Sequence, residues 1–289
     1  MTDNKETERD DHTGMETTGH DWDGIKELDT PMPRWWLWTM YATFVWGLAY
    51  VIAYPAWPMV TEATAGVLGY SSRGEVAEEI ARFEDMNAPL DAAIVQAELT
   101  GIESDAALRN YAVNGGAAIF RTYCSQCHGA GAAGAPGGYP NLLDDDWLWG
   151  GDVEAIYLTV AHGIRHDPDP DTRYSEMPAF GDILEDEEID AVVAYVAGLS
   201  SGALGDDHPG AEVYLDNCAD CHGEEGEGMR DLGAPNLADA IWLYGGDEAA
   251  IEQTVRYSRY GQMPAWNTRL TEAELRQVAV YVHGLGGGE

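Results

Sequence analysis

The feature that most constrains this chain is a pattern of residues that occurs twice in its C-terminal two thirds. Each copy has a glycine, a C-x-x-C-H-G motif, Pro-Asn-Leu, a Trp-Leu-aromatic-Gly-Gly-Asp stretch, Met-Pro-Ala and a closing amphipathic helix. The landmarks are Gly116, Cys124, His128, Pro140, Trp147, Asp152, Met177 and Glu187–Leu199 in the first copy, and Gly210, Cys218, His222, Pro235, Trp242, Asp247, Met263 and Ala273–Leu285 in the second. This matched order indicates a duplication that gives two small helical domains, too few for a solenoid. Domains of this size bury little core and usually need an additional stabilising element, which a large apolar cofactor would provide.

All four cysteines of the chain belong to the two C-x-x-C-H motifs. This spacing is typical of c-type haem attachment, because two thiols can add to the haem vinyl groups while the adjacent histidine meets the iron. We therefore predict two covalently bound haems c, one at each motif. Their attachment cysteines and iron-binding histidines are Cys124, Cys127 and His128, and Cys218, Cys221 and His222. A thioredoxin-like site would need a βαβ pattern, and a zinc site would have to join cysteine pairs from separate copies.

The second axial ligand of each haem is predicted to be a methionine. Met177 and Met263 each precede Pro-Ala at matched positions, and Met/His ligation occurs in cytochromes c. A methionine can also be core filler, but the match between the copies favours the ligand role. Met229 is a rival in the second copy only, and His162 or His166 could give bis-histidine ligation in the first copy only. With both faces of each iron occupied, we expect electron transfer and no substrate-turnover site.

Other residues are candidates to contact the haem propionates. Arg165 and Arg259 lie just before the methionine segments, and a guanidinium suits a carboxylate; a solvated charge is the alternative. Trp149 and Tyr244 precede paired glycines and could also donate to a propionate. The segment Asp167–Tyr174 (DPDPDTRY) belongs to the first copy alone and is expected to be a surface loop.

The segment Trp35–Tyr54 is predicted to cross a membrane. It holds no charged residue, and at 1.5 Å per residue it spans roughly 30 Å, the thickness of the bilayer hydrocarbon. Tryptophans cluster at its first end, and tyrosines and Trp57 lie at the other, as in aromatic belts. Pro33 and Pro55 bracket it, where a helix would begin and end. The alternative, a buried helix of a soluble domain, would need other long apolar segments to cover it.

The orientation of this anchor is predicted from charge and from chemistry. Lys26 and Arg34 precede the span, whereas the first cation after it is Arg73, which favours a cytoplasmic N-terminus. Haem is attached to C-x-x-C-H outside the bacterial cytoplasm, so we expect periplasmic haem domains on an uncleaved inner-membrane anchor.

The predicted organisation has five parts. They are a cytoplasmic tail over residues 1–34, flexible at Asp10–Thr30; an anchor helix over 35–57; a periplasmic spacer over 58–106 with helices at Glu75–Arg82 and Leu90–Leu99; and cytochrome c domains over 107–200 and 207–287, joined at Ser200–Asp207. The predicted fold class is therefore all-α, with one N-terminal transmembrane helix followed by two tandem cytochrome c-like domains.

The chain is strongly acidic, with 51 Asp and Glu against 15 Lys and Arg and a formal charge of −36. This argues against a nucleic-acid partner, because a phosphate backbone is bound by clustered cations. Two explanations stay open: adaptation to high salt, where counterions screen the charge, and attraction of a basic partner.

From about His20 to the C-terminus, the chain resembles the FixP/CcoP family, the di-haem subunit III of cbb3-type cytochrome c oxidase. The opening HDWDGIKELDTPMPRWW, which leads directly into the anchor helix, is the most family-specific segment. The resemblance implies Cys124, Cys127, His128 and Met177 around one haem, and Cys218, Cys221, His222 and Met263 around the other.

The same resemblance implies a role in respiration. Electrons would pass from a cytochrome c or a bc1-type reductase, through this subunit, to the mono-haem subunit or the catalytic haem-copper subunit, which reduces oxygen to water and pumps protons. The strong acidity and the extra segment of the first copy depart from the family pattern and leave the docking partner open. A free-standing, membrane-tethered di-haem carrier is the main alternative. A di-haem peroxidase or sensor would need one iron to lose a ligand.

Overall fold

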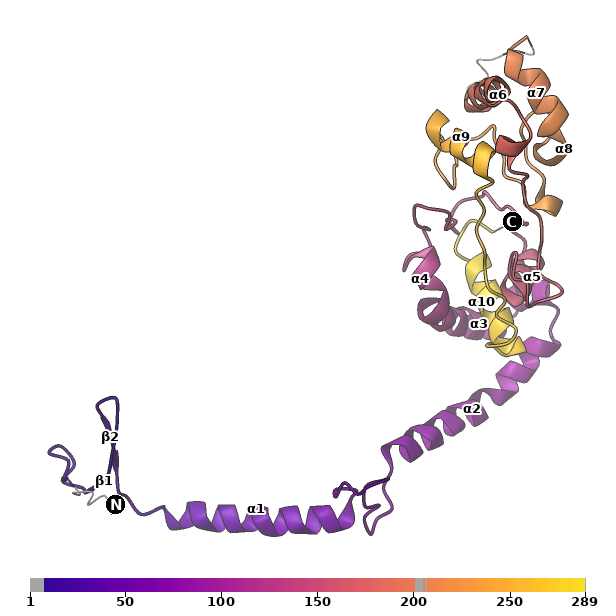
Figure 1. Cartoon of the computed structure of the whole chain (residues 1–289). Coiled ribbons are helices and arrows are strands. Elements are labelled where there is room, and N and C mark those ends of the chain that lie inside the picture. The colour runs from indigo at the N-terminus through magenta and orange to yellow at the C-terminus, as the bar shows by residue number, and fades with distance from the viewer. Residues whose placement is uncertain (1–7, 201–204, 206, 289) are drawn as a thin grey trace. The chain divides into compact units, whose positions relative to one another are not determined.

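The computed structural model describes residues 8–200, 205 and 207–288 (Figure 1). It divides into two units, one up to Asp85 and one from Met86 onwards. The predicted joint at Ser200–Asp207 and the first residues of the tail lie mostly outside the described residues. The fold is helix-rich, with one candidate membrane helix followed by two tandem cytochrome c domains.

The first unit begins with a β-hairpin where a flexible tail was predicted. Strand β1 (Thr17–Trp22) pairs antiparallel with β2 (Ile25–Leu28), with Trp22 opposite Ile25. The connecting Asp23 and Gly24 both have positive φ, +54° and +90°. An Asp-Gly pair favours this two-residue turn, so the sequence held a hairpin signal that composition concealed.

Helix α1 (Arg34–Ala53) is the candidate membrane span. Among the described residues it is the one helix long and apolar enough to cross a bilayer, and none of its side chains is buried against the chain. Pro33 precedes it and Pro55 follows shortly after its end, as expected.

Helix α2 (Ser72–Gln96) is continuous where two shorter helices were predicted. Pro89 lies inside it, and a proline has no N–H to donate to the carbonyl four residues earlier, that of Asp85. The two units divide at this same residue. The end of α2 belongs to the second unit, where Ile94 is fully buried.

The second unit contains two hydrophobic cores built from many short helices. The elements of the first repeat are the 3-10 helix η1 (Leu99–Ser104), α3 (Ala106–Ile119), the π-helical turn η2 (Phe120–Cys124), α4 (Ser125–His128), α5 (Val153–His162), η3 (Phe180–Asp182) and α6 (Asp186–Leu199). Those of the second are α7 (Pro209–Asn217), α8 (Ala219–His222), η4 (Arg230–Leu232), α9 (Glu248–Tyr257) and α10 (Glu272–His283).

The two repeats exchange their C-terminal helices. Helix α3 of the first repeat packs against α10 of the second, while α6 of the first packs against α7 of the second (Figure 1). One core therefore combines residues 94–161 with residues 263–285, and the other combines residues 177–199 with residues 211–255. We call these lobe 1 and lobe 2.

Glycines allow both helix pairs to cross closely. A Cβ on Gly116 of α3 would lie 2.3 Å from the carbonyl oxygen of Gln277 in α10. A Cβ on Gly210 of α7 would lie 2.1 Å from the carbonyl oxygen of Ala191 in α6. Both glycines occupy the same position in their repeats, so the close crossing is a shared property of the two lobes.

Candidate haem sites

Each C-x-x-C-H motif ends on a short helical turn, α4 in one repeat and α8 in the other. In a helix, residues three apart share a face, so this turn presents both thiols of a motif to one side, with the histidine next to them. Gly129 and Gly223 then reverse the chain with φ of +78° and +81°.

The two motif histidines are oriented in the same way. The Nδ1 of His128 lies 3.2 Å from the carbonyl oxygen of Pro140, and the Nδ1 of His222 lies 3.0 Å from that of Pro235. A carbonyl only accepts, so Nδ1 carries the hydrogen and Nε2 is left as the ligand atom. Burial lowers the pKa of both imidazoles, although the bond to the carbonyl acts the other way. Both therefore stay neutral, the form that binds iron.

The cysteines do not suit thiol–disulfide chemistry. Burial, followed by the charge of the second cysteine, raises the pKa of Cys124 and of Cys218 to about 11. A redox-active thiol needs a lowered pKa, because the thiolate is the nucleophile. Cys127 and Cys221 are exposed. These sulfurs are better suited to become thioethers of a cofactor.

The structure places each methionine in the lobe that holds the motif of the other repeat, whereas the repeats suggested that a methionine and a motif of the same repeat lie together. Met263 packs on the core of lobe 1 with Cys124, and Met177 packs on the core of lobe 2 with Cys218. The rings of Tyr123, which directly precedes the first motif, and Trp266, three residues after Met263, lie 5.4 Å apart. The physical reason is the exchange of C-terminal halves, which carries each methionine into the lobe of the other repeat.

Two crossing segments produce this exchange. Ile164 and Met263 exchange both main-chain hydrogen bonds, at 2.9 and 3.0 Å. The side chain of Arg165 donates to the carbonyl of Gly261 at 2.7 Å. In the other lobe, the hydroxyl of Ser258 donates to the carbonyl of Met177.

The alignment of Arg165 with Arg259 is wrong, because Arg173 is the structural counterpart of Arg259. Arg173 donates to the carbonyl of Trp149 and stacks on its ring at 5.5 Å, as Arg259 does with Tyr244 at 5.0 Å. The shared sequence R-Y-x-x-M-P-A was the signal that could have found this match. The segment without a counterpart is therefore 164–172.

Trp149 carries an observation that fits a haem. Its indole N–H is buried without a hydrogen-bond partner among the residues that the structure describes. Its ring fits against Gly233 of the other repeat, where a Cβ would lie 2.2 Å away, and Tyr244 fits against Gly138 in the same way. A buried N–H needs an acceptor, and a haem propionate would supply one. The donors, histidines and thiols present therefore fit haem c.

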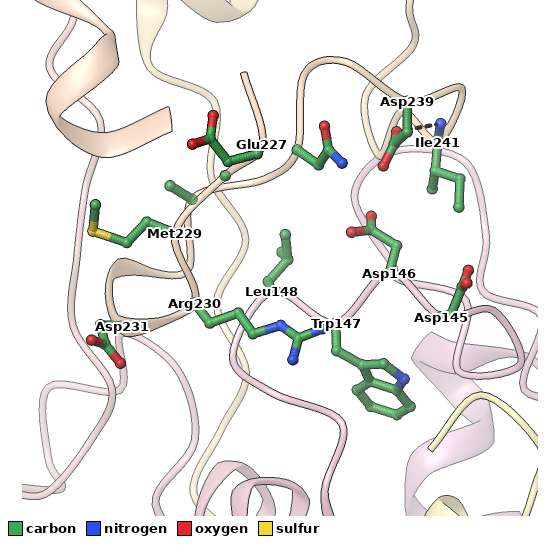
Figure 2. Close-up of a pocket in the computed structure, with 13 residues that line it drawn as sticks. Asp145, Asp146, Trp147, Leu148, Glu227, Met229, Arg230, Asp231, Asp239 and Ile241 are labelled. Carbon is green, nitrogen blue, oxygen red and sulfur yellow. Dashed lines mark hydrogen bonds between the residues drawn. The ribbon is translucent and has the colours of Figure 1, made fainter. Parts of the chain in front are cut away.

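Two of the alternative axial ligands, His162 and Met229, make contacts outside the two motifs. The Nδ1 of His162 lies 3.2 Å from Asp169 on the inserted segment, a contact that leaves its Nε2 as the ligand atom and does not itself decide between the two ligation modes. Met229 lines a cavity of about 710 Å³ (Figure 2). The cavity lies between the loop at 145–148 and the loop at 227–241, and none of its lining residues belongs to a C-x-x-C-H motif.

This cavity is acidic, with five carboxylates and Arg230 among its lining residues. Figure 2 shows Asp146 and Asp239 on neighbouring loops. Burial, and then the charges of Asp239, Asp144 and Asp145, raises the pKa of Asp146 to about 6.

We expect Asp146→Asn to stabilise the protein above pH 6. Below about pH 4 the carboxyl is protonated in both the folded and the unfolded state. As the pH rises to 6 only the unfolded state loses its proton, so the wild type loses stability that the variant keeps. Half-exposure reduces the gain to about 1 kcal/mol at pH 7. Calorimetry at pH 4 and pH 7 measures it, with the exposed Asp145→Asn as control; an equal gain at both pH values would contradict the prediction.

Fold and site together define a membrane-anchored c-type cytochrome with two haem-attachment motifs. Residues 14–61 match the N-terminal domain of cytochrome oxidase-cbb3, FixP. Residues 112–196 and 205–282 match the family described as cytochrome c oxidase, cbb3-type, subunit III.

Several similar proteins align with nearly the whole chain. The cbb3-type cytochrome c oxidase subunit CcoP of Cereibacter sphaeroides is 58% identical over 281 residues, which is 94% of this chain and 95% of the relative. Subunit FixP of Rhizobium meliloti is 51% identical over 283 residues, 97% of each chain. Subunit CcoP of Rhodobacter capsulatus is 51% identical over 289 residues, 95% of this chain and 97% of the relative.

The chain therefore belongs to the CcoP/FixP family, subunit III of cbb3-type cytochrome c oxidase. The predicted family and electron-transfer function are confirmed. Membership implies that the chain binds haem c, assembles with other oxidase subunits and is anchored to a membrane.

Proposed function

We propose that the chain binds two haems c and uses them to pass electrons within the oxidase. Cys124, Cys127 and His128 would hold one haem together with Met263. Cys218, Cys221 and His222 would hold the other together with Met177. Haem supplies one-electron redox chemistry when bound, and the chain supplies neutral histidines, thioether sulfurs and donors to the propionates.

The electron path runs from a cytochrome c or bc1-type donor toward the catalytic haem-copper subunit, directly or through the mono-haem subunit. There oxygen is reduced to water and protons are pumped. The observation that carries this proposal is the match of residues 14–61 to the FixP N-terminal domain, ahead of two cytochrome domains. A free-standing tethered carrier needs only a membrane helix, so it does not account for that segment.

The chain crosses the bacterial inner membrane once, with the N-terminus in the cytoplasm and both lobes in the periplasm. Support comes from the one candidate span among the residues that the structure describes, from the cations that precede it and from the periplasmic site of haem attachment.

Purification of the native protein in mild detergent tests this function. Reduced-minus-oxidised spectra with and without CO should show haem b and a CO-reactive centre together with the c-type bands. A c-type spectrum that is inert to CO, from an intact membrane preparation, would favour the free-standing carrier instead.

Trp149→Phe tests the propionate contact. The phenyl ring keeps packing against Gly233 but removes the N–H, and hydrogen bonds to charged groups are worth about 1.5–3 kcal/mol. We expect a lower thermal stability of the haem-loaded protein and a lower midpoint potential of one haem, because the ionised propionate then favours the ferric state. Tyr244→Phe is the matched variant in the second repeat. Higher stability with an unchanged potential would show that the indole has no acceptor.

A further inference from the structure

The segment 164–172 is the main difference between the two crossing regions. In the second repeat, Arg259 follows Ser258 directly, whereas in the first this segment separates Gly163 from Arg173. Gly163 and Ser258 both end the preceding helix with positive φ, +70° and +54°, so the extra residues enter at one defined point.

The ends of the segment form a small ladder with the backbone of Met263. Arg165 N–H donates to the carbonyl of Arg173 at 2.8 Å, and Arg173 N–H donates to that of Gly163 at 3.3 Å. Ile164 thus bridges Arg173 in parallel on one edge and Met263 antiparallel on the other. The inserted segment thus holds the backbone of Ile164 in place, and Ile164 in turn pairs with Met263.

The middle of the segment contacts the far end of residues 263–267, which we call the Met263 loop. Asp169 is 8% exposed and accepts from Nδ2 of Asn267 at 2.6 Å and from the backbone N–H of Asp171 at 2.8 Å. Nδ1 of His162 lies 3.2 Å from the same carboxylate. Burial raises the pKa of Asp169, but these hydrogen bonds outweigh it and keep the pKa below its ordinary value. An ionised acceptor therefore holds Asn267.

The backbone beside this contact is tied to the first repeat as well. Asn267 N–H donates to the carbonyl of Ala161 at 3.2 Å, and Trp266 N–H donates to that of Val160 at 3.1 Å. Residues 263–267 are thus held at both ends, by the ladder at Met263 and by the carboxylate at Asn267.

Lobe 2 lacks this support. The residue at the position of Asn267 is Gly181, which has no side chain to donate, and the crossing of the second repeat has no residues that correspond to 164–172. There the carbonyl of Met177 accepts from the Ser258 hydroxyl.

We propose that segment 164–172 is a clamp on the Met263 loop, with Asp169 as its positioning residue, and that it makes Met263 a firmer axial ligand than Met177. The proposal rests on the proposed function, in which both methionines bind haem iron. Its consequence is that the two haems differ in how readily an external ligand displaces their methionine.

The test uses the full-length, haem-loaded chain in detergent. Four variants are compared with the wild type: Asp169→Ala; Asp169→Asn; Asn267→Gly, which introduces the residue of lobe 2; and Asp167→Ala, a control with the same charge change as Asp169→Ala at an exposed position of the same segment. Imidazole is titrated against the ferric protein, the loss of the methionine–iron charge-transfer absorption is followed, and hydrogen exchange is measured at 263–267 and at 177–181.

For the wild type we expect two displacement phases. In Asp169→Ala and Asn267→Gly, the tighter methionine should be displaced at about one tenth of the imidazole concentration, with faster exchange at 263–267 and no change at 177–181. Asp167→Ala should resemble the wild type. Asp169→Asn, which keeps one acceptor oxygen, should lie between. If Asp169→Ala does not fold, Asn267→Gly carries the test, because glycine is tolerated at the matching position of lobe 2.

Two results would overturn the inference in distinguishable ways. Unchanged displacement in Asp169→Ala and Asn267→Gly, with or without faster exchange at 263–267, would leave Asp169 a purely structural role. A wild type without methionine–iron absorption would remove the proposed ligation itself, and the clamp with it.

Discussion

Replacing Met263 with histidine should change the haem bound at Cys124 and Cys127, although Met263 belongs to the other repeat. Met263 packs on the core that contains Cys124, and its backbone is paired with Ile164. Methionine ligation raises the potential of a cytochrome c haem, so Met263→His should lower the midpoint potential of that haem, by about 0.1 V or more within the roughly 0.8 V range that axial ligands span. Redox titration of the purified chain measures it.

Single-haem variants assign the effect. With Cys218→Ala and Cys221→Ala, the remaining haem should respond to Met263→His and be indifferent to Met177→His. With Cys124→Ala and Cys127→Ala the dependence should reverse. Where a single-haem chain does not fold, NMR contacts from the bound methionine of the intact ferric protein give the same assignment. A haem that responds to the methionine of its own repeat would contradict the exchanged pairing.

The exchange shows where sequence reasoning stops. The C-x-x-C-H motifs and the Met-Pro-Ala segments each predict one local structure, and those elements are present. Two repeats with the same landmarks in the same order, however, offer every C-terminal helix two similar partners, and the pattern within each repeat is the same for either choice. The choice depends on the crossing at Ile164 and Met263, which involves main-chain hydrogen bonds that residue types do not encode.

Other departures also have local causes. The Asp23-Gly24 turn lies inside a polar, acidic segment whose composition indicated a flexible tail. The continuity of α2 overrides Pro89, since neighbouring turns supply hydrogen bonds on both sides of the missing one. The role of Arg173 was missed because the extra segment was assigned to Asp167–Tyr174, whereas it covers residues 164–172. That assignment aligned Arg165 with Arg259. The burial of the Trp149 N–H, without a partner among the described residues, depends on packing and cannot be read from the sequence.

The close crossing of α3 and α10 leads to the second large effect. Gly116→Ala should destabilise lobe 1, because the new Cβ would lie 2.3 Å from the backbone oxygen of Gln277 and 2.6 Å from the Cβ of Tyr281. Neither atom can move without displacing α10. Overpacking of this kind costs about 3 kcal/mol, against a gain of about 1 kcal/mol from replacing a helical glycine. The net loss of about 2 kcal/mol should appear as a lower thermal midpoint of the haem-loaded chain.

The neighbouring Gly115 provides the matched control. A Cβ there would meet the end of the Gln277 side chain, with Oε1 at 2.0 Å, and this flexible group can turn aside. Turning would weaken its hydrogen bond to Asp91 at 3.2 Å, while the gain in helix propensity offsets that loss. We therefore expect Gly115→Ala to change stability by less than about 1 kcal/mol. Equal losses of stability for the two variants would mean that glycine at this crossing serves the flexibility of α3. A loss of stability confined to Gly116→Ala would tie the stability of lobe 1 to α10, a helix that comes from the other repeat.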